Sequence, residues 1–219
     1  LYYWIMARIA NLIQLFVPTI SSLDMLSLLR LVNVGFAIGN LVTTYLITKE
    51  VVNIKFWNLL PIYLLSNTLM FVFLAGGVNY DNLANLLASL SIHYLIRFLK
   101  RQQPKDLLLL IVFVLAGCLT KLTSITMGGI ILLILIYAYF KQPMTPPKIK
   151  YSYAVLLAVS FVLLILNARL HINNITTYNT IRPECEDIFT HEQCKISPFV
   201  QREEKLALPE RLTILEAVK

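Results

Sequence analysis

Hydrophobic runs of bilayer-crossing length follow one another along most of the chain, and this arrangement restricts the fold more than any single motif. A hydrocarbon core about 30 Å thick is crossed by about 20 apolar residues in a helix. Only 14% of the 219 residues are charged and 58% are hydrophobic, whereas soluble domains carry about 25% charged residues. We therefore predict an all-α, polytopic transmembrane helix bundle in a lipid bilayer. Six segments are predicted to cross it: 28–47, 57–76, 82–98, 107–120, 123–140 and 151–168.

The two ends of the chain differ from this pattern. In the stretch 2–18, the polar residues Arg8, Asn11 and Gln14 are spaced three apart and lie near one helical face. We interpret this stretch as an amphipathic helix lying in the membrane interface, with an ordinary crossing as the alternative. After the last crossing the chain becomes more polar. We therefore expect a transmembrane domain over 1–168 and a small extramembrane tail over 169–219.

Basic residues indicate the orientation of the bundle. The net charge is +7, and residues 1–168 contain twelve Lys and Arg against four acidic residues. Linkers rich in Lys and Arg stay on the cytoplasmic face. We therefore expect the basic residues to set the orientation of the chain in the membrane and not to bind a nucleic acid. The tail then lies on the non-cytoplasmic side, of a bacterial plasma membrane or, in a eukaryote, of the endoplasmic reticulum. Nine of the twelve lie on alternate linkers: Lys49, Lys55, Arg97, Lys100, Arg101, Lys105, Lys141, Lys148 and Lys150.

A polar element begins at the non-cytoplasmic start of the third crossing. Asp81, Asn85, Ser89 and His93 recur every four residues and form one stripe along a helix. Such a stripe faces the bundle or a wet cavity, because exposing polar groups to lipid is costly. Asp81 and Asn85 are therefore candidate ligands for a polar substrate or its phosphate, and Asp81 also for a divalent metal ion. An alternative, equally open, makes Asp81 the N-cap of the helix. We interpret His93 as a buried packing histidine.

Lys121 is the second candidate for binding a phosphate. The preceding segment 107–120 spans about 21 Å as a helix, which is short of a hydrocarbon core of about 30 Å. It meets the next crossing through the polar stretch 120–124. A helix of this kind is tolerated only against protein or a water-filled cavity, so we expect a cavity on the non-cytoplasmic side. A lysine there can meet a phosphate, or it can simply snorkel to the interface.

Cys185 and Cys194 bracket a short polar loop in the tail. Thiols on the non-cytoplasmic side can oxidise, and closing a loop of about ten residues stabilises a fold by about 2–3 kcal/mol. We therefore predict a disulfide, with two free thiols or half of a metal site as alternatives, although no His/Cys pair has the spacing of a zinc site. Cys118 lies inside a crossing, where we expect it to be inert.

Four stretches of the chain form a recognisable series: LYYW at 1–4, LRLVN at 29–33, VNYDNLANLL at 78–87 and AGCLTK at 116–121. In this order they resemble the PPLYYW interfacial helix, the RL…N span, the N-x-D-x-L element and the G-x-x-T-K turn of the polytopic GT-C glycosyltransferases. Protein O-mannosyltransferases and bacterial aminoarabinose transferases belong to that superfamily. The resemblance extends over about residues 1–140 as a pattern.

The resemblance implies an enzyme that takes a sugar from a polyprenyl-phosphate carrier and passes it to an unknown acceptor at the non-cytoplasmic face. A cation at the leaving phosphate, from Lys121 or from a divalent metal near Asp81, would stabilise the developing charge. In the family the first span and the catalytic carboxylate precede this pattern, so we expect both upstream of Leu1. The alternatives are a transporter or flippase subunit, which would favour internal repeats that we do not see, and a non-catalytic scaffold.

Overall fold

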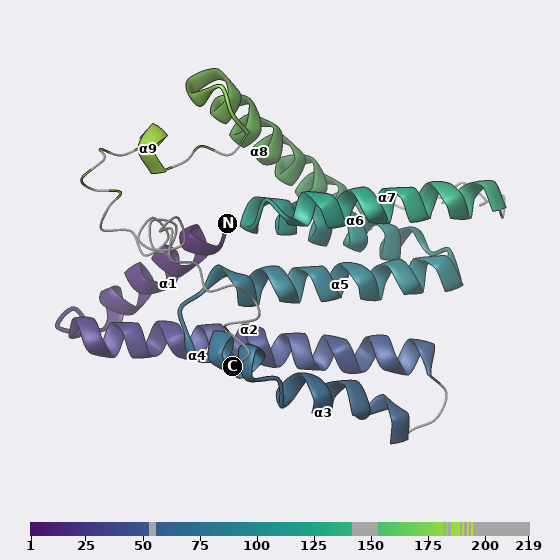
Figure 1. Cartoon of the computed structure of the whole chain (residues 1–219), viewed down its shortest axis with the longest axis horizontal. Helices are drawn as coiled ribbons and strands as arrows, with labels where there is room; N and C mark the ends of the chain where they lie inside the picture. The colour runs from purple at the N-terminus through teal and green to yellow at the C-terminus, as the bar shows by residue number, and fades with distance from the viewer. Residues whose placement is uncertain are drawn as a thin grey trace, which may run out of the picture. The chain divides into compact units, whose positions relative to one another are not determined.

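The computed structural model describes residues 1–52, 56–141 and 153–181, together with residues 183, 185–188, 190, 192 and 194. Over these residues the chain is all-α, as predicted (Figure 1). It divides into two compact units, Leu1–Ala168 and Arg169–Lys219. The helices are α1 (Tyr2–Phe16), α2 (Ser22–Val51), a 3₁₀ turn (Phe56–Asn58), α3 (Leu60–Ser66), α4 (Leu69–Gly76), α5 (Tyr80–Arg101), α6 (Pro104–Thr120), α7 (Ser124–Lys141), α8 (Ala154–Tyr178) and α9 (Cys185–Ile188).

Among the described residues, α2, α7 and α8 are long and apolar enough to cross a membrane. Many of their large hydrophobic side chains are exposed in the chain by itself, which is expected of helices that face lipid. Three apolar helices of this length make the chain an integral membrane protein. The start of the first of them, α2, is set by Ser21, whose Oγ accepts a hydrogen bond from the backbone N–H of Asp24 at 3.2 Å.

α5 lies between α2 and α6 and packs along both (Figure 1). Its buried apolar side chains include Leu83, Leu87, Leu95 and Phe98. Because neighbouring helices cover α5, it can carry polar side chains that a lipid-facing helix could not. Its partner α6 has 17 residues and is shorter than an ordinary crossing. The crossings 82–98 and 107–120 therefore stay predictions, whereas α2, α7 and α8 meet the requirements of length and composition.

The predicted crossing 57–76 is wrong as a single helix. It consists of the 3₁₀ turn, α3 and α4, with a break at Asn67 and Thr68. The Asn67 side-chain amide donates to the Tyr63 carbonyl at 2.8 Å, and the Thr68 hydroxyl donates to the Leu64 carbonyl at 2.9 Å. Short polar side chains that bond to carbonyls one turn back compete with the helical ladder. The hydrophobicity of the whole segment conceals this local competition.

The helix of the last predicted crossing, 151–168, extends beyond residue 168. α8 continues to Tyr178, so the first ten residues of the predicted tail are helical. No Gly or Pro interrupts this stretch, and the helix ends where Asn179 adopts a left-handed conformation with φ 54°. In the second unit, Cys185 and Cys194 form the predicted disulfide, with their Cα atoms 5.7 Å apart.

Charged residues join three helix ends at one end of the first unit. On α5, Arg101 Nη2 lies 2.7 Å from Glu50 Oε1 of α2, and Arg97 Nη2 lies 3.2 Å from Oδ1 of the buried Asp106 of α6. These basic residues belong to the linkers predicted to be cytoplasmic, and they lie at the opposite end of α5 from Asp81. Lys55, Lys148 and Lys150 lie outside the described residues.

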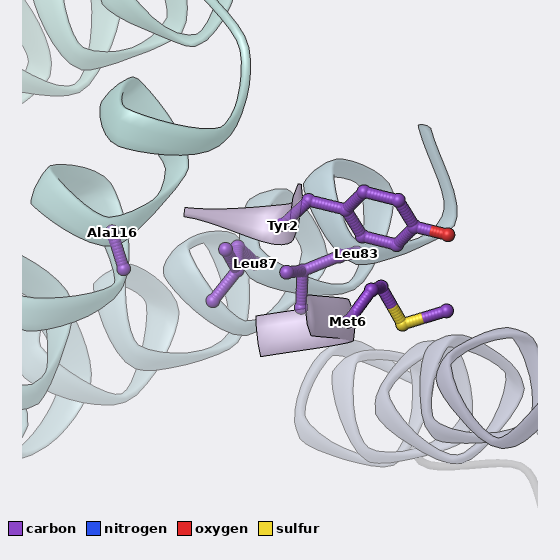
Figure 2. Close-up of a cluster of buried hydrophobic side chains, with 5 residues drawn as sticks. All are labelled: Tyr2, Met6, Leu83, Leu87 and Ala116. Atoms are coloured by element: carbon purple, nitrogen blue, oxygen red, sulfur yellow. The ribbon is translucent and has the colours of Figure 1, made fainter. Parts of the chain in front are cut away.

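α1 packs against the other end of the bundle. Tyr2 and Met6, one turn apart, are its buried residues. They form one buried cluster with Leu83 and Leu87 of α5 and Ala116 of α6 (Figure 2). The three polar residues of α1 that suggested an interfacial helix, Arg8, Asn11 and Gln14, are exposed, but so are apolar residues such as Trp4 and Phe16. The interfacial position therefore stays a prediction.

Candidate functional site

The candidate site lies where the start of α5 meets the end of α6. The two helices pack along each other and run in opposite directions, so the start of α5 lies near the end of α6 (Figure 1). The start of α1 joins them, because the Leu1 backbone nitrogen donates to the Leu119 carbonyl at 2.9 Å. Side chains from three helices can therefore contribute to one site at this end of the bundle.

Asn79 is the N-cap of α5, so the interpretation of Asp81 as the cap is wrong. Asn79 Oδ1 accepts a hydrogen bond from the backbone N–H of Asp81 at 3.0 Å, and Asn79 Nδ2 donates to Asp81 Oδ2 at 3.2 Å. Asn79 has the extended backbone of an N-cap, with φ −137° and ψ 135°. Asp81 is left in the first turn, where the helix dipole favours its negative charge.

Lys121 and Asp81 form an ion pair at the centre of this site. Lys121 Nζ lies 2.6 Å from Asp81 Oδ1, and 5.5 Å from the centre of the Tyr80 ring. The two side chains are 37% and 23% exposed, so a ligand can reach both. Lys121 directly follows α6, where the helix dipole favours a positive charge. Its ammonium group has three donors, and those that Asp81 does not use can bind an anion.

The rest of the predicted polar stripe does not join the ion pair. Asn85 lies one turn along α5 with an exposed side chain, and within the described part of the chain the side-chain hydrogen bonds of Asp81 go to Asn79 and Lys121. Ser89 donates to Asn40 Oδ1 of α2. His93 is buried against the Tyr94 ring, with the ring centres 5.1 Å apart. Only the first residue of the stripe, Asp81, therefore belongs to the site, whereas Ser89 and His93 take part in the packing of the helices.

A cavity of about 490 Å³ adjoins the ion pair through Asn79. It has a mostly apolar wall, supplied by α4, and one cation, Arg30 of α2. An apolar wall with a cation suits an amphiphile that has an anionic head. Arg30 is not among the site residues predicted from the sequence, although a charge inside a predicted crossing is itself a signal of function. The cavity is lined by Arg30, Val72, Phe73, Leu74, Gly76, Gly77 and Asn79.

The side chains at this site do not fit a divalent metal ion in the arrangement that the structure shows. Asp81 Oδ1 faces the Lys121 ammonium and Oδ2 accepts from Asn79, whereas a bound cation requires several free oxygen ligands. In the described part of the chain, no three His, Cys, Asp or Glu side chains come together as a ligand set. Positive charge at this site is instead supplied by Lys121 and Arg30.

The model of the family described as dolichyl-phosphate-mannose-protein mannosyltransferase matches residues 5–169. This range includes Arg30, Asp81 and Lys121. No curated protein and no solved structure matches the chain.

Proposed function

Because the chain belongs to the dolichyl-phosphate-mannose-protein mannosyltransferase family, we propose that it acts as a membrane glycosyltransferase with a polyprenyl-phosphate-linked sugar as donor. The acceptor approaches at the non-cytoplasmic membrane face, because the described basic linkers lie at the other end of α5. The observation that carries the proposal is the Asp81–Lys121 pair beside a cavity that contains Arg30. The proposal covers the donor class and leaves the sugar and the acceptor to experiment.

The cavity suits the carrier in both of its chemical parts. Val72 and Phe73 of α4 line it and are also 55% and 75% exposed, so an isoprenoid chain can lie on α4 and extend into lipid. The phosphate then lies toward Arg30 and Asn79. Lys121 is close by, because Asp81 bonds to both Asn79 and Lys121. Guanidinium and ammonium groups are the side chains that bind phosphate oxygens in proteins.

The reaction assigned to this site is a displacement at the anomeric carbon. The acceptor oxygen forms a bond to that carbon while the bond to the phosphate oxygen breaks, and polyprenyl phosphate leaves with the electron pair. Lys121 and Arg30 stabilise the negative charge that develops on the leaving phosphate. The acceptor proton leaves with the polyprenyl phosphate, whose oxygens can accept it, and not with Asp81, because the Asp81 carboxylate is already engaged by Lys121 and Asn79. It holds the Lys121 ammonium in place.

The test is transfer by the purified full-length protein in lipid nanodiscs, given polyprenyl phosphates that carry mannose, glucose or aminoarabinose. Release of polyprenyl phosphate is measured for the wild type, for Lys121→Met and for a matched control, Lys105→Met. Lys105 is an exposed lysine at the opposite end of the same helix. We expect release with one donor, a loss of at least about tenfold in Lys121→Met, and no loss in the control.

Two other results would contradict the proposal. A wild type that releases no polyprenyl phosphate with any donor, with or without added peptide or lipid A acceptors, is the result expected of a scaffold. A wild type that moves the intact carrier across the membrane of a vesicle, with the sugar still attached, is the result expected of a flippase.

A further inference from the structure

The last carbonyls of a helix have no partner farther along the same helix, and at the end of α4 the Leu74 carbonyl accepts one bond from the backbone N–H of Gly77 at 3.2 Å. Two asparagines from other helices supply partners here. Asn82 of α5 donates through Nδ2 to the Leu74 carbonyl at 2.7 Å. Asn33 of α2 donates through Nδ2 to the Gly77 carbonyl and also lies 3.4 Å from the Leu74 carbonyl. Both asparagines are fully buried, at 2% and 0% exposure.

A third side chain fixes the orientation of Asn33. The Tyr2 hydroxyl donates to Asn33 Oδ1 at 3.3 Å, and burial raises the pKa of Tyr2 to about 12, so this hydroxyl stays protonated. Carbonyls can only accept hydrogen bonds, so the amide nitrogen of Asn33 must face α4 and its oxygen must face Tyr2. In Figure 2 the Tyr2 hydroxyl points away from Ala116. Asn82 of α5 and Asn33 of α2 therefore bind the end of α4 directly, and Tyr2 of α1 orients Asn33.

The chain segment that follows this end forms part of the site. Gly76, Gly77 and Asn79 line the cavity, and Asn79 also caps α5 and bonds to Asp81. Only three residues separate Gly76 from Tyr80, the first residue of α5. Any movement of the Leu74 and Gly77 carbonyls therefore moves the wall of the cavity beside the ion pair.

From this geometry we propose that Asn33 and Asn82 are positioning residues, which hold the end of α4 so that the segment 76–79 is placed to receive the carrier phosphate. The proposal rests on the proposed function for the identity of the ligand. Neither side chain lines the cavity, so both act through the backbone that they bind. Without these donors, the Gly77 carbonyl would lose its bond to Asn33 and the Leu74 carbonyl would keep only the bond from the Gly77 backbone N–H. Lost hydrogen bonds are costly in a membrane protein.

The experiment compares Asn82→Leu with Asn167→Leu in the full-length protein in nanodiscs. Asn167 is a matched control, because it is 7% exposed and its amide donates to the Leu115 carbonyl of α6 at 3.0 Å. Hydrogen exchange over residues 69–79 reports on the end of α4, and native mass spectrometry reports binding of polyprenyl phosphate. The KM for the sugar-linked carrier and kcat are measured on the same preparations.

We expect Asn82→Leu to speed exchange over 73–79 and to weaken polyprenyl phosphate binding about tenfold. The KM should rise by a similar factor while kcat changes less. Asn167→Leu should lose thermal stability without any of these changes. Tyr2→Phe should shift exchange and binding in the same direction as Asn82→Leu, but less. If Asn82→Leu does not fold, Asn82→Ala removes the same donor with less disturbance.

Unchanged binding in Asn82→Leu, or an equal loss in Asn167→Leu, would overturn the positioning role. If the wild type binds polyprenyl phosphate but transfers no sugar, the proposed function fails, while the binding and exchange comparisons still decide whether the two asparagines position the segment. A wild type that does not bind polyprenyl phosphate would overturn both.

Discussion

The Asp81–Lys121 pair gives the sharpest prediction, because two conservative substitutions remove its charges one at a time. Asp81→Asn keeps an oxygen that can accept from Asn79, and it leaves the backbone N–H that Asn79 caps unchanged. Lys121→Met keeps an unbranched apolar stem of four heavy atoms and removes the ammonium group. Neither change opens a cavity, because both side chains are partly exposed. Loss of charge is therefore the main perturbation in each variant.

The expected magnitudes follow from the exposure of the pair. Exposed ion pairs contribute about 0.2–1 kcal/mol to folding stability, and this pair, at 37% and 23% exposure, belongs near the upper end of that range. Each single variant should therefore lose about 1 kcal/mol of stability at most. Loss of a cation at the leaving phosphate should lower kcat/KM at least about tenfold, or about 1.4 kcal/mol of transition-state stabilisation.

A double-mutant cycle then separates the roles of the two residues. If Asp81 acts by holding Lys121, the double variant should transfer sugar about as slowly as Lys121→Met alone. The assay is polyprenyl phosphate release by the full-length protein, with the melting temperature of each variant measured in parallel. Normal transfer in both single variants would refute the site. Rates that fall only in proportion to the loss of folded protein would reduce the pair to a structural contact.

Three further predictions follow from the fold. Arg30→Met should raise the KM for the sugar-linked carrier about tenfold, whereas Arg8→Met on the exposed face of α1 should leave it unchanged, and equal KM values would remove Arg30 from the site. A single cysteine at Gln103 should be labelled only from the cytoplasmic side, because it lies in the α5–α6 turn among basic residues; labelling from outside intact cells would invert the topology. Intact mass should rise by about two daltons on reduction of the Cys185–Cys194 disulfide, and an unchanged mass would mean free thiols.

Much of the membrane architecture could be predicted from the sequence, because hydrophobicity over a helix length reports directly on the surrounding solvent. The same reasoning placed Asp81 and Lys121 on one side of the bundle, since successive crossings alternate in direction. It also selected Cys185 and Cys194, because two thiols that bracket a short loop can meet without any knowledge of the remaining fold. These features depend on local composition and on the order of segments along the chain.

The break in the predicted crossing 57–76 could not be found in this way. Asn67 and Thr68 can bond to the preceding helical turn or leave the helix intact, and hydrophobicity does not distinguish the two outcomes. Contacts at the far end of α4 are hidden from the sequence pattern for a different reason, because they come from other helices. Asn33 and Asn82 supply donors for the end of α4, and these donors are 41 and 8 residues away along the chain from the Leu74 carbonyl that they approach.

By itself, the sequence therefore determined that the chain is all-α, that three of its helices are long and apolar enough to cross a membrane, and which polar residues follow one helical face. Only the tertiary structure decided that Lys121 touches Asp81 at 2.6 Å and that Arg30 shares a cavity with the end of α4. A helix that faces lipid is apolar on every side, so its hydrophobic pattern carries little information about which neighbour it packs against. Partners in such a bundle are chosen by side-chain fit and by buried hydrogen bonds between helices, and these exist only once the helices have come together.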